Sequence, residues 1–312
     1  MGTLRPRALR KLGMLALGIF FSGLLGCGPS GSLESDSTNG SDGEPGQTPT
    51  TLPQPTFVHP DFRLTQQELE SILDRLHEQE PRALTDGVRA KILARPRTFL
   101  DQVNTLFTYP DETFLLADKE HLLPEGYVPS DLVRLEDYQA PDLQSPGLVL
   151  NRQGLELRQI ILPDLLAMAE AAQGEGIVLD LSSAYRSYEY QRGLFQTWVE
   201  SLGLEEAQRV SARAGTSQHQ LGTTIDFGSI TLEFATHPAG RWLAARAWDF
   251  GFSLSYPEGQ ESLTGYAFEP WHFRWIGKES TKIEQELFEG SQFRFLLFWN
   301  LVKDDLYQVW QN

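Results

Sequence analysis

Three short segments contain most of the side chains that could do chemistry: Tyr185–Gln191, Ser217–Asp226 and Glu269–Arg274. The second segment contains His219 and Asp226, and the third contains Glu269 and His272. Two neutral imidazoles and one carboxylate leave the fourth position of a tetrahedral zinc ion open, which is typical of catalytic rather than structural zinc sites. In this interpretation, Glu269 stays free for proton transfer.

The single cysteine limits the ligands that a metal could have. One cysteine among 312 residues excludes an intramolecular disulfide framework and a cysteine-rich zinc cage. Any metal must therefore be held by His, Asp or Glu. Each segment alone is weak evidence, because most histidines are ordinary core or surface residues. Four histidines lack comparable surroundings: His59, His77, His121 and His237.

Local patterns predict the elements that must position these segments. The apolar run Ile177–Leu181 predicts a buried strand, and it places Arg186 near the junction with a helix from Tyr188 to Val199. The other predicted elements are helices at 159–173, 240–250 and 283–310 and strands at 223–227, 252–256 and 271–276. This mixed order favours an α+β fold over alternating βαβ units.

The third segment contains one geometric conflict. Glu269 and His272 are separated by an odd number of residues, so a regular strand would place them on opposite faces. A shared site therefore requires an irregular entry to the strand, for which Pro270 is a plausible cause.

The combined motif order is recognisable. Tyr-Arg-Ser, then Ser-x-His-(x)6-Asp, then Glu-x-Trp-His resembles the VanY-like D-alanyl-D-alanine carboxypeptidase family of zinc peptidases. The resemblance runs from near Asp111 to Gly277 and includes Leu122–Pro129 and Phe250–Tyr266. It implies a small, mostly antiparallel sheet with flanking helices, as in the Hedgehog/D-Ala-D-Ala metallopeptidase fold, together with an N-terminal helical appendage.

The resemblance also implies residue roles. His219, Asp226 and His272 match the zinc ligands and Glu269 the catalytic base, while Arg186 matches the arginine that faces the substrate and the developing oxyanion. Positions that line the substrate pocket in similar enzymes are occupied by Gln191, Ser217, Tyr256 and Trp271. Three positions depart from the common pattern: Gln218 replaces a frequent glutamate, Ala184 a frequent glycine and Ser255 a common arginine.

The charge balance limits the partners. Lys and Arg total 26 and Asp and Glu total 42, so the net charge is 26 − 42 = −16. Such an acidic chain repels phosphate backbones, so we expect no nucleic-acid partner. The expected partners are peptidoglycan stem peptides and a membrane.

The membrane is expected because of the N-terminus. Residues 1–26 have a basic start and an apolar stretch from Leu12 to Leu25 that is short for a permanent span, as in a signal peptide. The stretch ends at Leu24-Leu25-Gly26-Cys27, which resembles a bacterial lipobox and implies lipidation of Cys27. The alternatives are an uncleaved anchor or a secreted protein with an unrelated cysteine.

We expect five regions in the chain. They are a lipoprotein signal peptide (1–26), a lipidated cysteine and polar linker (27–58), a helical appendage (59–110), a zinc carboxypeptidase domain (111–279) and a C-terminal helical flank (280–312). The linker composition cannot build a packed core. In the appendage, Thr65 and Glu68 have the spacing of a helix capping box.

The resemblance implies a zinc-dependent carboxypeptidase that removes terminal D-alanine from peptidoglycan stem peptides. It would be lipid-anchored in the cell envelope, at the outer membrane and periplasm or on the outer face of the cell membrane. The open alternatives are an L,D-carboxypeptidase or endopeptidase with the same site, and a non-catalytic wall-binding module.

Overall fold

The computed structural model of the protein describes residues 57–137 and 147–310. The expected signal peptide, Cys27 and nearly all of the expected linker lie outside the described residues. In the described ranges, no helix combines the length and the apolar character needed to cross a membrane.

The helices are α1 (Gln66–Gln79), α2 (Asp86–Ala94), α3 (Pro96–Leu106), α4 (Leu162–Gly174), α5 (Tyr188–Leu202), α6 (Leu204–Val210), α7 (Pro238–Arg246), α8 (Glu261–Thr264), α9 (Lys278–Leu287) and α10 (Gln292–Trp310). The strands are β1 (Phe57–His59), β2 (Phe62–Thr65), β3 (Leu132–Arg134), β4 (Leu148–Leu150), β5 (Glu156–Arg158), β6 (Leu179–Ser183), β7 (Thr224–Phe227), β8 (Phe252–Leu254) and β9 (His272–Trp275). Within the described residues, the 3₁₀ helices are η1 (Asp111–Phe114), η2 (Leu135–Asp137), η4 (Gln159–Ile161), η5 (Gln218–Leu221), η6 (Leu232–Thr236) and η7 (Ala247–Phe250).

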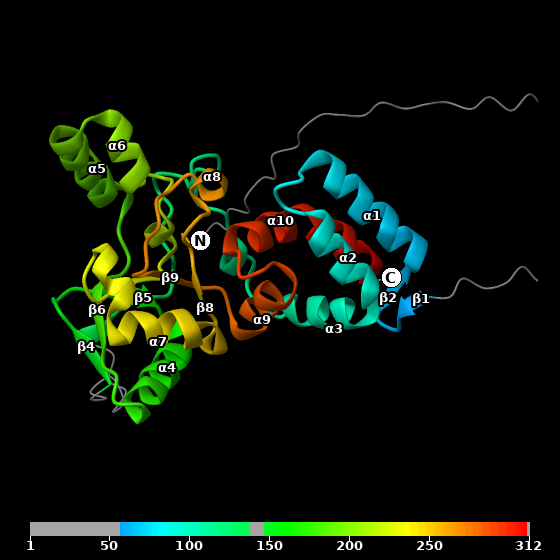
Figure 1. Ribbon diagram of the computed structural model, residues 1–312, viewed down its shortest axis with the longest axis horizontal. Helices are drawn as coiled ribbons and strands as arrows, with labels where there is room; N and C mark the ends of the chain where they lie inside the picture. The colour runs from blue at the N-terminus through cyan, green and yellow to red at the C-terminus, as the bar shows by residue number, and fades with distance from the viewer. Residues whose placement is uncertain (1–56, 138–146, 311–312) are drawn as a thin grey trace, which may run out of the picture. The chain divides into compact units, whose positions relative to one another are not determined.

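A five-stranded sheet in the order β4-β6-β7-β9-β8 organises the central part of the chain. The β4–β6 pair is parallel and the other three pairs are antiparallel. Helices α4 and α7 lie against this sheet (Figure 1). The apolar core that they share with it includes Leu165, Met168, Leu181, Ile225, Trp242 and Phe273. The predicted α+β fold with a small, mostly antiparallel sheet is confirmed.

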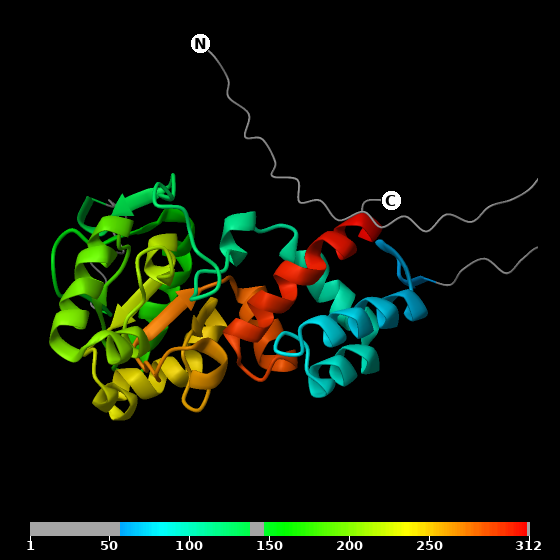
Figure 2. The same ribbon diagram turned by 90° about the horizontal axis from the view of Figure 1, so that it is seen from above.

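The two helical ends of the chain pack together. Helices α1, α2 and α3 share one apolar core with α9 and α10 (Figure 2), whose buried members include Leu69, Leu73, Phe99, Val103, Phe288, Phe295, Phe298 and Trp299. Phe114 and Ile276 join this core from the segments that lead into and out of the central part. The first helix starts as expected, because Thr65 and Glu68 form the capping box.

Several predicted elements differ from the structure. The helix expected at 240–250 is α7, which ends at Arg246, followed by the 3₁₀ helix η7. The helix expected at 283–310 is two helices, because Glu289 and Gly290 adopt left-handed φ angles of 59° and 69° between α9 and α10. The strand expected at Ile177–Leu181 is β6 at Leu179–Ser183, where pairing of Leu179 with Leu148 of β4 sets its start.

An acidic side chain is buried in α9. Glu284 is 1% exposed, and its Oε1 accepts a hydrogen bond of 2.8 Å from Ser253 Oγ of β8. Its Oε2 has no hydrogen-bond partner among the described residues. Burial raises the pKa of Glu284 to about 8.

Glu284 should therefore make folding stability depend on pH. In the folded protein the carboxyl stays protonated up to about pH 8, whereas in the unfolded chain it ionises above about 4.5. The free energy of unfolding should fall as pH rises through this window. Glu284→Gln should remove that loss and be more stable than the wild type at pH 8, by on the order of 4 kcal/mol, with little difference near pH 5.

Denaturant unfolding at pH 5 and pH 8 tests this prediction. Glu286→Gln is the matched control, because Glu286 lies on the same helix and is exposed. Equal pH dependence of unfolding in the wild type and Glu284→Gln would contradict the prediction.

Candidate metal centre

The pairing of three strands places two candidate ligands on one face of the sheet. Asp226 of β7 lies opposite His272 of β9 and next to Ser183 of β6. Side chains of directly opposed residues in an antiparallel pair point to the same face, a few ångströms apart. The register therefore brings Asp226 and His272 together, although they are far apart in sequence.

The third candidate ligand enters from the turn before β7. His219 lies in η5, and Gly222 follows with a left-handed φ of 70°. A Cβ at Gly222 would lie 2.9 Å from a methyl carbon of Leu132, so the tight turn needs glycine. His219 Nδ1 donates to the carbonyl of Ala184, 2.6 Å away at the end of β6, so its Nε2 faces Asp226.

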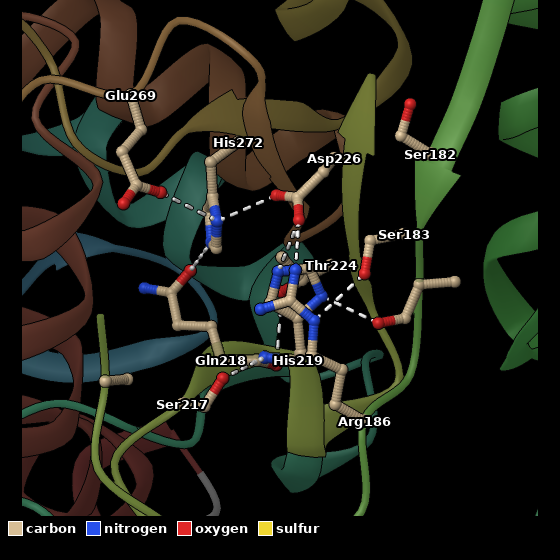
Figure 3. Close-up of polar contacts among 12 residues, drawn as sticks. Ser182, Ser183, Arg186, Ser217, Gln218, His219, Thr224, Asp226, Glu269 and His272 are labelled. Atoms are coloured by element: carbon tan, nitrogen blue, oxygen red, sulfur yellow. Dashed lines mark hydrogen bonds and ion pairs between the residues drawn. The ribbon is translucent and has the colours of Figure 1, made fainter. Parts of the chain in front are cut away.

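His219, Asp226 and His272 form a buried cluster whose ligand atoms all lie within 4.8 Å of one another (Figure 3). His219 Nε2 lies 3.2 Å from Asp226 Oδ2, and His272 Nδ1 lies 3.1 Å from Asp226 Oδ1. In the described part of the chain, His219 Nε2 and Asp226 Oδ1 are buried without a hydrogen-bond partner. Buried lone pairs that converge in this way fit a metal ion.

Glu269 lies beside the cluster and outside the strand. The chain turns at Pro270 and Trp271, with the His272 amide donating to the Glu269 carbonyl at 3.2 Å, and β9 starts at His272. The Glu269 carboxylate is thereby 3.2 Å from His272 Nδ1, with 14% of its side chain exposed. Burial raises its pKa. The predicted irregular entry to this strand is confirmed.

Arg186 follows β6 and reaches the same cluster. Its Nε donates to Ser183 Oγ at 2.9 Å, and its Nη2 pairs with the Asp226 carboxylate. Two directional contacts fix the plane of the guanidinium next to the candidate metal position.

The three candidate ligands differ in protonation. Burial, together with the charge of Arg186, lowers the pKa of His219 to about 4. Burial opposes ionisation of Asp226, but the neighbouring His219 and Arg186 hold its pKa well below the usual range. Burial also opposes protonation of His272, but the neighbouring Asp226 and Glu269 carboxylates raise its pKa to about 9.

A cavity of about 200 Å³ opens over the cluster. All nine residues expected in the site line this cavity: Arg186, Gln191, Ser217, His219, Asp226, Tyr256, Glu269, Trp271 and His272. Gln191 also supports the wall, because its Nε2 donates to the Ala212 carbonyl at 2.7 Å. Ser217 Oγ accepts a hydrogen bond from the His219 amide at 3.3 Å.

The sequence analysis missed other residues of the cavity wall, among them Arg152, Tyr190, Leu194, Trp198, Ile230 and Tyr266. Tyr190, Leu194 and Trp198 are spaced by four residues along α5, so they share one helix face. Tyr190 and Trp198 are 51% and 39% exposed. The sequence signal that could have identified these residues was an apolar stripe along a helix that has little contact with the core.

Comparisons with known proteins match this region. Residues 154–278 match the family model described as VanY, D-alanyl-D-alanine carboxypeptidase. The YodJ protein of Bacillus subtilis (strain 168) is 33% identical over 183 residues, which cover 57% of this chain and 64% of YodJ. A D-alanyl-D-alanine carboxypeptidase of Enterococcus faecium is 30% identical over 178 residues, which cover 55% of this chain and 54% of the enterococcal protein.

A solved structure has a similar fold. The LdcB LD-carboxypeptidase, whose structure addresses peptidoglycan recognition, aligns with a TM-score of 0.52 and 29% identity, over 60% of this chain and 86% of that chain. The present chain spans less than two thirds of the length of the two curated relatives.

The protonation states predict how metal binding responds to pH. His272 must lose its Nδ1 proton before that nitrogen can bind a metal, whereas His219 and Asp226 are already deprotonated at pH 7. Zinc binding at pH 7 should therefore release about one proton, and the apparent affinity should rise about tenfold per pH unit from pH 6 to 8.

Chelator competition across this pH range measures the affinity, and calorimetry in buffers of different ionisation enthalpy counts the protons. An affinity that is constant from pH 6 to 8 would contradict the prediction.

Proposed function

We propose that the protein is a zinc carboxypeptidase that removes terminal D-alanine from peptidoglycan stem peptides, because residues 154–278 match the VanY family model of D-alanyl-D-alanine carboxypeptidases. One observation carries the proposal. The carboxylate of Glu269 lies 3.2 Å from a candidate ligand, at the edge of a buried cluster of two histidines and one aspartate. A site that only binds has no need of such a carboxylate.

His219, Asp226 and His272 would hold the zinc. When bound, zinc supplies Lewis acidity, which lowers the pKa of water and polarises a carbonyl. The two histidines and one carboxylate suit this ion, and the cavity beside them leaves space for a substrate.

Glu269 would manage the protons. Its raised pKa brings it nearer to neutral pH, where a carboxyl group can both accept and return a proton. Amide hydrolysis needs both transfers, because the attacking water loses a proton and the leaving amine gains one. Glu269 lines the cavity, so it is accessible to both the attacking water and the leaving amine.

Arg186 would stabilise the negative charge that develops on the substrate carbonyl oxygen. Its contacts with Ser183 and Asp226 fix the guanidinium before the substrate arrives. A donor that is already oriented needs little reorganisation during the reaction, which makes its electrostatic stabilisation effective.

The point of cleavage requires an experiment. D,D-carboxypeptidases, L,D-carboxypeptidases and endopeptidases can share this machinery, and the relatives include proteins named for the first two activities. Mass spectrometry of purified pentapeptide, tetrapeptide and cross-linked muropeptides after incubation with the protein distinguishes them. Loss of one alanine from the pentapeptide alone supports the D,D-activity, and no cleavage of any substrate favours the wall-binding module.

Glu269→Ala tests the assigned proton transfer. The variant should keep its zinc, because Glu269 is not one of the three ligands, while D-alanine release falls by about 10²- to 10⁴-fold. Zinc content, a melting curve and release from a defined stem peptide are measured together.

Glu258→Ala, which removes an exposed carboxylate outside the cavity wall, is the control. Unchanged turnover in folded, zinc-loaded Glu269→Ala would refute the role of Glu269.

We also propose that Cys27 carries a lipid that tethers the enzyme to the cell envelope, on the basis of the lipobox-like Leu24-Leu25-Gly26-Cys27. Cys27→Ser should move the protein from the membrane fraction to the soluble exported fraction, while hydrolysis is retained. Fractionation and immunoblotting measure the shift. A variant that stays with the membrane would rule out the lipid as the anchor.

A further inference from the structure

A row of buried amides connects His272 with the first residue of α10. His272 Nε2 lies 3.3 Å from Gln218 Oε1, and Gln218 Nε2 donates to Gln292 Oε1 at 3.1 Å. Gln292 Nε2 in turn donates to the backbone carbonyl of Ser253 at 3.3 Å. Gln218 is 8% exposed and Gln292 is 1% exposed.

The contact between Gln292 and the Ser253 carbonyl fixes the orientation of both amide groups in the row. A backbone carbonyl can only accept, so Gln292 must turn its NH₂ group toward Ser253 and its oxygen toward Gln218. Gln218 must then point its NH₂ group at Gln292 and its oxygen at His272. Facing an acceptor, His272 Nε2 must carry a hydrogen, and Nδ1 is the nitrogen left for a metal.

The surroundings leave few alternative partners. Ser255 Oγ donates to Gln218 Oε1 at 2.7 Å in this orientation, and a hydroxyl group is compatible with it. The cavity beside Gln218, Ser255 and Gln292 measures about 10 Å³, which holds at most about one water molecule. Bulk water therefore cannot replace a lost amide.

We propose that Gln292, acting through Gln218, is a positioning residue that holds the His272 ring with Nδ1 toward the metal and Nε2–H toward Gln218. The inference rests on the proposed metal at the cluster. It assigns a role in the site to a residue of α10, which lies beyond the family match at residues 154–278. A ligand held in one tautomer and one orientation binds metal more tightly, because less freedom is lost on binding.

Gln292→Met and Gln292→Glu form the test pair. Methionine has similar length but removes the acceptor, so Gln218 can rotate and present its NH₂ group to His272. Glutamate keeps an acceptor for Gln218 in either ionisation state. Loss of the hydrogen-bond partner that orients a metal-binding histidine typically lowers metal affinity by about 10- to 100-fold. We expect a loss of this size in Gln292→Met and a smaller loss in Gln292→Glu, measured by chelator competition.

Asn300→Leu is the matched control for a general effect on α10. Asn300 Nδ2 donates to the Phe114 carbonyl at 2.7 Å, so the variant also removes an amide contact of this helix, but one that does not lead to His272. It should lower the melting temperature and leave zinc affinity at the wild-type value.

Proton NMR of the zinc-loaded protein separates positioning from destabilisation. Besides the resonance of His59 Nε2, which contacts Asp101, the wild type should show protected imidazole N–H resonances from His219 Nδ1 with its Ala184 partner and from His272 Nε2 with its Gln218 partner. In Gln292→Met, only the His272 resonance should shift or broaden.

Two results would overturn the proposal: wild-type zinc affinity in Gln292→Met, or equal affinity losses in Gln292→Met, Gln292→Glu and Asn300→Leu. A wild type that binds zinc but cleaves no stem peptide would contradict the proposed activity and leave this inference standing. A wild type that binds no zinc would end both.

Discussion

The register between β7 and β9 is the constraint on which the site depends. It places Asp226 opposite His272. A shift of one residue would turn one of them to the other face of the sheet, because side chains alternate along a strand. Cross-strand neighbours extend the effect, since Ser183 of β6 lies next to Asp226 and holds Arg186. Two candidate metal ligands and the guanidinium are thus positioned by the pairing of β6, β7 and β9, whereas His219 enters from the turn before β7.

The buried cluster of His219, Asp226 and His272 has opposing effects on folding stability and on cation binding. Burying Asp226, His219 and His272 together removes them from water, which costs free energy unless each group finds a partner. Arg186 and the Ala184 carbonyl satisfy part of this need, but lone pairs of His219 and Asp226 remain unmatched. Such unmatched atoms are a weakness in an ordinary core and a useful feature where a cation binds.

The sequence predicted which candidate residues lie together better than it predicted the boundaries of elements. His219, Asp226, Glu269 and His272 were found because chemistry restricts residue type and order, and the strands around them have clear apolar patterns. The break at Glu289 and Gly290 was missed because apolar side chains continue on both sides of it. The short strand β4 was missed because three residues carry no period, and its pairing also sets where β6 begins. The contact between Gln218 and Gln292 depends on tertiary packing across 74 positions, which no local pattern records.

The shared core of the first and last helices affects the order of assembly. Arg75 of α1 pairs with Asp305 of α10 across 230 positions. The helices that are synthesised first therefore cannot complete their contacts until α10 has been synthesised. Contacts of such long range form late, since closing the intervening chain costs entropy. A chain that ended before α9 and α10 would leave the apolar faces of α1, α2 and α3 exposed to proteolysis. Only molecules that include α9 and α10 would therefore complete this core.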